Sequence, residues 1–259
     1  MQIFHILRGL FRGALNHKNF ILVFDWFYPE FFGIVKKCLT VYSEPCDDEV
    51  VLLIFKLLHE LVDNSSNRLK FDAWSINGLI VYKESASFMI EFMQKFSCLS
   101  PQQGKPLKQN DIYKEIYKYL KVFIGMMQSF ISGRYINFAI CEYYNDQTFT
   151  HVSQLVFQCI VNQDLASLQG YNKLSRKLYA FVEEFFKHHL ELIFLRFDFN
   201  LVMQVINQAL LPGVAAELSE VKSSALLTID SLNTFVFENL RRPSKKQPEM
   251  AQNVQKFYA

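Results

Sequence analysis

Apolar residues recur at helical spacing along almost the whole chain, and no stretch keeps the alternation of a strand. Residues three or four apart share one face of an α-helix, so this spacing predicts amphipathic helices. In 107–132 the apolar face consists of Ile112, Ile116, Leu120, Phe123, Met127 and Phe130. Further helices are expected at 30–42, 48–62, 76–96, 148–162, 173–190, 199–210 and 217–240. The pattern therefore predicts an all-α protein.

Breaks between these helices are short. The 259 residues include only 9 Gly and 7 Pro, well below the usual shares of about 7% and about 5%. Breaks are expected at 64–67, 101–106, 133, 170 and 212–213. Short breaks make antiparallel helix pairs, which predict an α-solenoid of HEAT or armadillo type, with a helical bundle as the alternative. We expect five to six pairs in 1–240, then a basic linker and the start of a further helix in 241–259.

The segment Phe20–Phe27 is apolar on more than one side, since Asp25 is its only charged residue. Such a segment needs neighbours on two faces, as an inner repeat does. No polar cap precedes it. We therefore expect residue 1 not to be a natural end of the fold and the chain to be part of a longer solenoid.

Charge and cysteine content limit the partners and the compartment. The formal net charge is +2, so no strong field draws nucleic acid or an anionic membrane over the whole surface. The five cysteines lack C-x-x-C spacing, and they are expected to be reduced core thiols in a cytosolic or nuclear protein. The longest run without charge, 199–216, contains amides and Pro212 and is not expected to span a membrane.

Spacings typical of catalytic or metal sites are missing. The chain has neither a dinucleotide-binding glycine pattern nor a phosphate-binding loop. His59-Glu60 resembles half of a zinc-protease helix, but Asp63 stands where the second His is needed. His188 and His189 point in different directions on a helix. We therefore expect no enzyme activity, no catalytic or metal-binding residues and no cofactor.

Two basic segments have alternative interpretations. Tyr113–Lys121 interleaves aromatic residues with lysines, as a base-stacking surface does, although lysines at this spacing also mark the solvated face of a helix, the interpretation we favour. Nucleic acid is accordingly not an expected partner. Arg241–Lys246 is either a nuclear import signal or a solvated linker, and the linker is favoured.

Two stretches do not fit a simple helix. They are 67–80, where charged and aromatic residues precede Asn77-Gly78, and 132–138, followed by 143–146. Long solenoid loops of this kind either pack between repeats or bind partners, and periodicity leaves both possibilities open.

The same stretches resemble a known family. Leu61–Asp72, with Ser75, Asn77–Ile80 and Lys83-Glu84, is similar to the pattern E-L-x-x-N-x-S/T-Q-R-L-x-F-D-x-S-S-x-N-G-x-L-L-F-R-E. Phe24–Pro29 resembles F-D/E-W-I/L-Y-P, and Ser132–Phe138 with Tyr144–Asp146 resembles S-G-x-Y-V-N-F and L-Y-G-D. These motifs are similar to the later repeats of the exportin-seven branch of the karyopherin-β (importin-β) nuclear transport receptors, and less closely to the exportin-four branch. Departures include Asn67 in place of Gln and Asn145 where Gly is usual.

The resemblance, which covers about residues 5–245, implies a part of a nuclear export receptor. Its implied partners are protein cargo, Ran-GTP through repeats outside this chain, and nucleoporins, and it implies shuttling between nucleus and cytoplasm. A Ran-independent scaffold for cytoplasmic complexes is the alternative.

The motif loops supply the candidate site. Its residues either meet a partner or lock adjacent repeats, with Arg68 and Asp72 satisfying buried backbone groups, and the lock is the favoured interpretation. The candidates are Arg68, Phe71, Asp72, Asn77, Tyr135, Asn137 and Phe138.

Overall fold

The computed structural model describes residues 1–41, 48–71, 75–95, 116–241 and 248–258. The chain divides into two compact units, Met1–Val152 and Ser153–Ala259. The first contains α1 (Gln2–Gly13), α2 (His17–Val41), α3 (Asp48–Val62), α4 (Asn77–Lys95), α6 (Lys118–Ser132) and α7 (Phe138–Tyr143). Helix α8 (Thr148–Val161) crosses the boundary. The second contains α9 (Leu165–Gln169), α10 (Asn172–His188), α11 (Leu190–Arg196), α12 (Phe199–Val205), η4 (Ile206–Leu210), α13 (Leu211–Val214), α14 (Ser219–Arg241) and α15 (Pro248–Tyr258).

The predicted all-α class is confirmed, because the described residues form helices and turns and no strand. The helices form the antiparallel pairs of a HEAT-type solenoid. None of the described helices is long and apolar enough to cross a bilayer. Of the predicted linker in 241–259, residues 242–247 lie outside the described residues.

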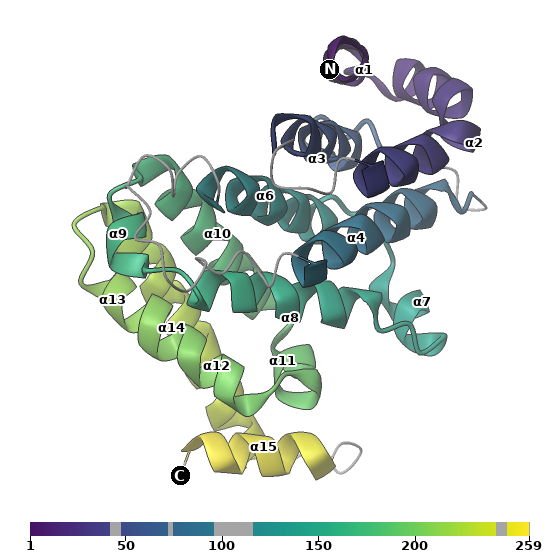
Figure 1. Ribbon diagram of the computed structural model, residues 1–259. Coiled ribbons are helices and arrows are strands. Elements are labelled where there is room, and N and C mark those ends of the chain that lie inside the picture. Colours follow the sequence, from purple (N-terminus) through teal and green to yellow (C-terminus); the bar gives the residue numbers. More distant parts are fainter. Residues whose placement is uncertain (42–47, 72–74, 96–115, 242–247, 259) are drawn as a thin grey trace. The chain divides into compact units, whose positions relative to one another are not determined.

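In the first unit, α3 packs against α1, α4 and α6, so that α1, α3 and α6 follow one another in one layer (Figure 1). Aromatic rings fill the space between this layer and the partner helices. Phe55 of α3 contacts Phe92 of α4 and Phe123 of α6, with both pairs of ring centroids 5.0 Å apart. Edge-to-face pairs of this kind add to the free energy of simple burial.

Helix α2 begins earlier than predicted and runs through Pro29. A proline inside a helix costs about 3 kcal/mol, and the buried rings of Phe20, Phe24 and Phe31 on either side offset that cost. Leu22 and Trp26 of this segment are 71% and 73% exposed, so one face of it is uncovered within the described structure.

In the second unit, α10 packs along α14, and α15 contacts α11 and α14. Phe157 of α8 lies among the rings of Phe181, Phe185 and Phe197. These contacts bury the apolar face that the sequence pattern assigned to 173–190.

The predicted break at Pro212-Gly213 is wrong. The chain continues helically from α12 through the π turn η4 into α13, and the Leu211 N–H donates to the Ile206 carbonyl five residues earlier. A π turn is wider than an α turn, which leaves room for the Pro212 ring where it would otherwise strike the preceding turn. The Tyr179 hydroxyl donates to the Ala209 carbonyl at 2.7 Å and holds the turn against α10.

The side chains of Cys141 and Cys159 are buried and that of Cys38 is half-buried. Cys46 and Cys98 lie outside the described residues. Within the described ranges, no three His, Cys, Asp or Glu side chains gather around a metal position.

The two adjacent histidines have different environments, and His189 follows the last residue of α10. His188 is half-exposed and lies 3.5 Å from a Glu184 carboxylate oxygen, whereas the His189 ring packs against Phe185 at 5.2 Å. Burial and, to a smaller degree, the nearby His188 lower the pKa of His189 to about 4.

This lowered pKa predicts a pH-dependent stability. An unfolded His titrates near 6.5, so between about pH 6.5 and pH 4 the unfolded chain binds the proton more readily. The free energy of unfolding should therefore fall as pH drops through this window, by up to about 3 kcal/mol. Urea denaturation at pH 7.0 and 4.5 measures the loss. The loss of stability between pH 7.0 and 4.5 should be smaller in His189→Gln and nearly unchanged in His188→Gln. An equal loss in the original protein and in both variants would contradict the assignment to His189.

Candidate partner-binding site

The first motif forms a turn and an extended loop between α3 and α4. Helix α3 ends at Val62, and the Asn67 N–H donates to the Asn64 carbonyl at 2.9 Å. Asn67 has a φ of 54°, which is in the left-handed region that Asn tolerates better than most residues. The turn reverses the chain and directs Arg68 inward.

Arg68 is only 3% exposed. Its Nε donates to the Asp63 carbonyl at 3.0 Å, and its two terminal nitrogens donate to the carbonyls of Phe11 and Glu60. These carbonyls belong to the C-terminal turns of α1 and α3, where helices have unpaired acceptors and a partial negative charge. One guanidinium therefore caps two helices and joins neighbouring pairs.

The Arg68 side chain also has apolar and ionic neighbours. Its guanidinium carbon lies 5.2 Å from the centre of the Phe20 ring, a cation–π distance. Burial lowers the pKa of Arg68, and the nearby Asp63 and Glu60 oppose this effect. Glu60 in turn pairs with Arg8 at 3.1 Å, so the acidic residue of the discarded zinc motif has a structural partner.

Phe71 holds the far end of the loop. Its ring contacts those of Phe20 and Phe24 on α2, with centroids 6.3 and 5.5 Å away. Asp72, which was expected to bond to buried backbone groups, lies outside the described residues.

The second motif follows α6 and lies against the first. The Asn64 amide donates to the Gly133 carbonyl at 2.6 Å and accepts from the Leu69 N–H at 2.7 Å. Arg134 has a φ of 55°, and the chain then runs without regular secondary structure to α7. One amide side chain thus connects both motif loops.

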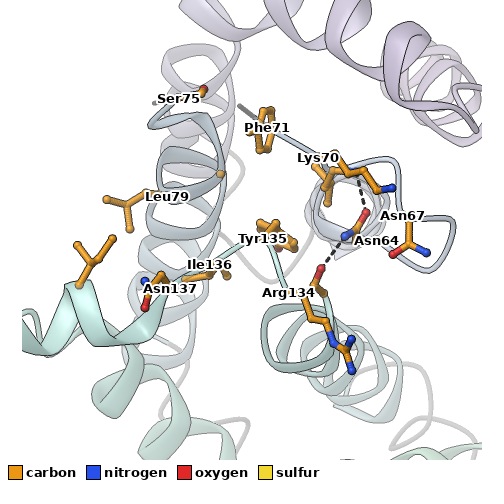
Figure 2. A pocket seen from close by; sticks show the side chains of 14 residues that line it. Asn64, Asn67, Lys70, Phe71, Ser75, Leu79, Arg134, Tyr135, Ile136 and Asn137 are labelled. Carbon is orange, nitrogen blue, oxygen red and sulfur yellow. Dashed lines mark hydrogen bonds between the residues drawn. The ribbon is translucent and has the colours of Figure 1, made fainter. Parts of the chain in front are cut away.

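A pocket of about 500 Å³ lies between the two loops and the start of α4 (Figure 2). We call it the motif pocket. Of the candidate residues, Phe71, Tyr135 and Asn137 line it. The lining residues are Asn64, Asn67, Leu69, Lys70, Phe71, Ser75, Gly78, Leu79, Gly133, Arg134, Tyr135, Ile136, Asn137 and Ile140.

The other described candidates, Arg68, Asn77 and Phe138, lie outside the lining. Arg68 points into the protein, and the Asn77 N–H donates to the Ser75 hydroxyl at 3.2 Å at the start of α4. The Phe138 ring packs against Tyr82 and Phe149, at 5.7 and 4.2 Å. The structure thus divides the described candidates into residues that line the motif pocket and residues whose contacts lie elsewhere within the protein.

Tyr135 both lines the motif pocket and has a buried hydroxyl group. The residue lines the motif pocket, but its hydroxyl oxygen is buried with no hydrogen-bond partner among the described residues. Burial, with a smaller effect of Asp63, raises the pKa of Tyr135 well above its usual value. The hydroxyl is therefore neutral at physiological pH.

Two glycines allow the close approach of the loops. A Cβ on Gly78 would lie 2.8 Å from the Tyr135 carbonyl oxygen, and a Cβ on Gly133 would lie 2.5 Å from the Tyr135 ring. Sequence reasoning did not select these glycines, nor Asn64, Lys70 and Arg134. All five lie within the motifs quoted above, and this position was the one sequence feature that could have indicated them.

The aromatic residues of the basic helix do not form a stacking surface. Tyr117 and Tyr119 are 3% and 2% exposed, while Lys118 and Lys121 lie close enough to Lys56 to lower its pKa, after the larger effect of burial and together with Arg8. The lysines mark the solvated side of the helix, as favoured. Tyr113 and Lys114 lie outside the described residues.

Comparison with known proteins places this helical-repeat chain beside a class of transport receptors. It is 24% identical to Exportin-7-B of Xenopus laevis over 241 residues, 27% identical to Ran-binding protein 17 of Mus musculus over 245, and 23% identical to Exportin-7 of Dictyostelium discoideum over 242. Each alignment covers 93% of this chain. The resemblance to the exportin-7 group is therefore confirmed.

The chain spans about a fifth of the length of these relatives, 21% to 23%. No protein-family profile matches it, and no solved structure matches it either.

The cap formed by Arg68 predicts a large loss of stability when it is removed. Arg68→Met keeps the apolar stem but removes the guanidinium donors to carbonyls of α1 and α3, and should lower the free energy of unfolding by about 2–4 kcal/mol. Urea denaturation followed by circular dichroism measures it. Arg176→Met is the control, because Arg176 forms an exposed pair with Glu220, and should change stability by less than about 0.5 kcal/mol. Equal effects of the two substitutions would contradict the capping role.

The contact at Gly78 gives a second prediction. Gly78→Ala places a methyl group against a backbone oxygen and should destabilise the protein by about 1–3 kcal/mol. Gly33→Ala is the matched control, because Gly33 is an exposed helical glycine with no atom within 4 Å of its Cβ position, and this change should stabilise by up to about 1 kcal/mol. Thermal melts of the two variants should therefore shift in opposite directions.

Proposed function

We propose that this chain is part of a nuclear export receptor that binds protein cargo together with Ran-GTP and carries it through the nuclear pore. The observation that carries the proposal is the similarity, over 93% of the chain, to relatives named as exportins and Ran-binding proteins. The HEAT-type helix pairs support it, since such solenoids bind partners along extended surfaces.

The mechanism we propose is differential binding. Changing the curvature of a solenoid costs little, so Ran-GTP and cargo can each favour one curvature and thereby strengthen the binding of the other. In this scheme the repeats are 1–240 and 241–259 leads into a further helix. Contacts with Ran-GTP lie on repeats outside this chain, and nucleoporins are the further partners.

The proposed role is not enzymatic and needs no cofactor, catalytic residue or metal. It involves neither membrane insertion nor nucleic acid. The receptor would shuttle between nucleus and cytoplasm. A Ran-independent scaffold for cytoplasmic complexes is the second candidate, because the same helix pairs would serve it.

A nucleotide-dependent binding assay separates the two candidates. The full product of the gene, immobilised, should retain Ran loaded with a non-hydrolysable GTP analogue and should retain Ran-GDP at least about tenfold less, a coupling of about 1.4 kcal/mol. The 259-residue chain alone should retain little of either. Equal retention of both nucleotide forms, or of neither, by the full product would exclude the export function and favour the scaffold.

A further inference from the structure

We propose that the motif pocket binds an extended peptide segment in which an acidic side chain lies next to an aliphatic one. The pocket lies wholly within the first unit, between the loop after α3 and the loop after α6. Its volume of about 500 Å³ is within the range of about 300–1,000 Å³ typical of ligand sites.

The two sides of the motif pocket differ in chemistry. Figure 2 shows Leu79 and Ile136 on one side, and Lys70, Asn67 and Arg134 on the other. Ile140 of α7 also lines the motif pocket and is 46% exposed. An aliphatic side chain placed against this wall would remove apolar surface of both molecules from water, which favours binding.

The opposite side of the motif pocket carries positively charged side chains. Lys70 and Arg134 are exposed, and neither forms an ion pair within the part of the chain that the structure describes. Among the described residues that line the pocket there is no Asp or Glu, and Asp63 lines a neighbouring pocket together with Arg134. A carboxylate at this side would therefore be attracted by positive charge, and Arg134 can bind it through two parallel hydrogen bonds.

The pocket is held in shape before any ligand arrives. Asn64 bonds both loops, and the contact of Gly78 with Tyr135 fixes the start of α4 against the second loop. Asn67 and Arg134 keep a left-handed φ at its edge, a conformation that persists only where its surroundings impose it. A site that is already ordered loses less entropy on binding.

The polar groups favour a peptide over a fatty acid or a phosphate. Exposed amide side chains of Asn67 and Asn137 lie at the edge of the pocket and match the N–H and C=O groups of a peptide backbone. The alkyl chain of a fatty acid would cover these amides without giving them hydrogen-bond partners, which is unfavourable. A phosphate alone would leave the apolar side of the pocket uncovered. The inference does not depend on the proposed function, since the pocket would accept such a segment in a receptor or in a scaffold.

Fluorescence anisotropy with a defined peptide tests this inference. The probe is a fluorescein-labelled peptide in which Glu alternates with Leu, added to the full 259-residue chain. Replacing its Glu residues by Lys, or its Leu residues by Ser, should each weaken binding at least about tenfold. Raising the salt concentration should weaken binding of the original peptide, because exposed charges are screened.

Substitutions assign the binding to the motif pocket. Lys70→Glu combined with Arg134→Glu should weaken binding about tenfold or more, and Ile140→Ser should weaken it several-fold through lost apolar contact. Lys222→Glu, an exposed change in α14, is the charge-matched control and should leave the affinity unchanged. Lys70→Glu alone keeps the backbone at Arg134 intact, so it should still weaken binding if the double variant proves unstable.

Three results would overturn the proposal. They are no binding of the peptide at about 1 mM, equal loss of affinity in Lys222→Glu and Lys70→Glu, or tighter binding of octanoate or inorganic phosphate than of the peptide. Loss of Ran-GTP binding by the full gene product would bear on the proposed function and not on these measurements.

Discussion

The first unit depends on one guanidinium group that bonds to backbone carbonyls at the ends of two helices. Burying an arginine is costly unless every donor has an acceptor, and the ends of α1 and α3 provide the acceptors that Arg68 needs. With Arg68 fixed, Leu69 and Phe71 follow in an extended path, and Asn64 can reach Gly133. The loop that lines the motif pocket therefore also joins two helix pairs, through Arg68 on its buried side.

Helical periodicity predicted much of the fold. The helix expected at 48–62 is observed with those bounds, and those at 76–96 and 148–162 differ by a residue at one or both ends. It placed the start of a helix at residue 30, whereas α2 begins at His17, and it took Pro212 as a break, although a wider turn accommodates the proline ring. Intrinsic preference is weak beside tertiary packing.

The site was less predictable than the fold. The motif resemblance led to Phe71, Tyr135 and Asn137, which line the pocket, and to Arg68, which does not. Periodicity could not indicate that Asn64 bonds to a residue 69 positions later in the sequence. One departure from the family pattern has a physical explanation: Asn145 stands where Gly is usual and has a φ of 53°, a conformation that Asn adopts more readily than other residues with a side chain.

The π turn before Pro212 affects how this chain should be compared with its relatives. A hydrogen bond that spans five residues encloses one residue more than an α turn, so the faces of the helix before and after η4 are offset by that residue. An ungapped alignment with a relative that has a regular helix here would match a buried position on one side of the turn with an exposed position on the other. Substitution patterns in 199–214 are best compared separately for the parts before and after the turn.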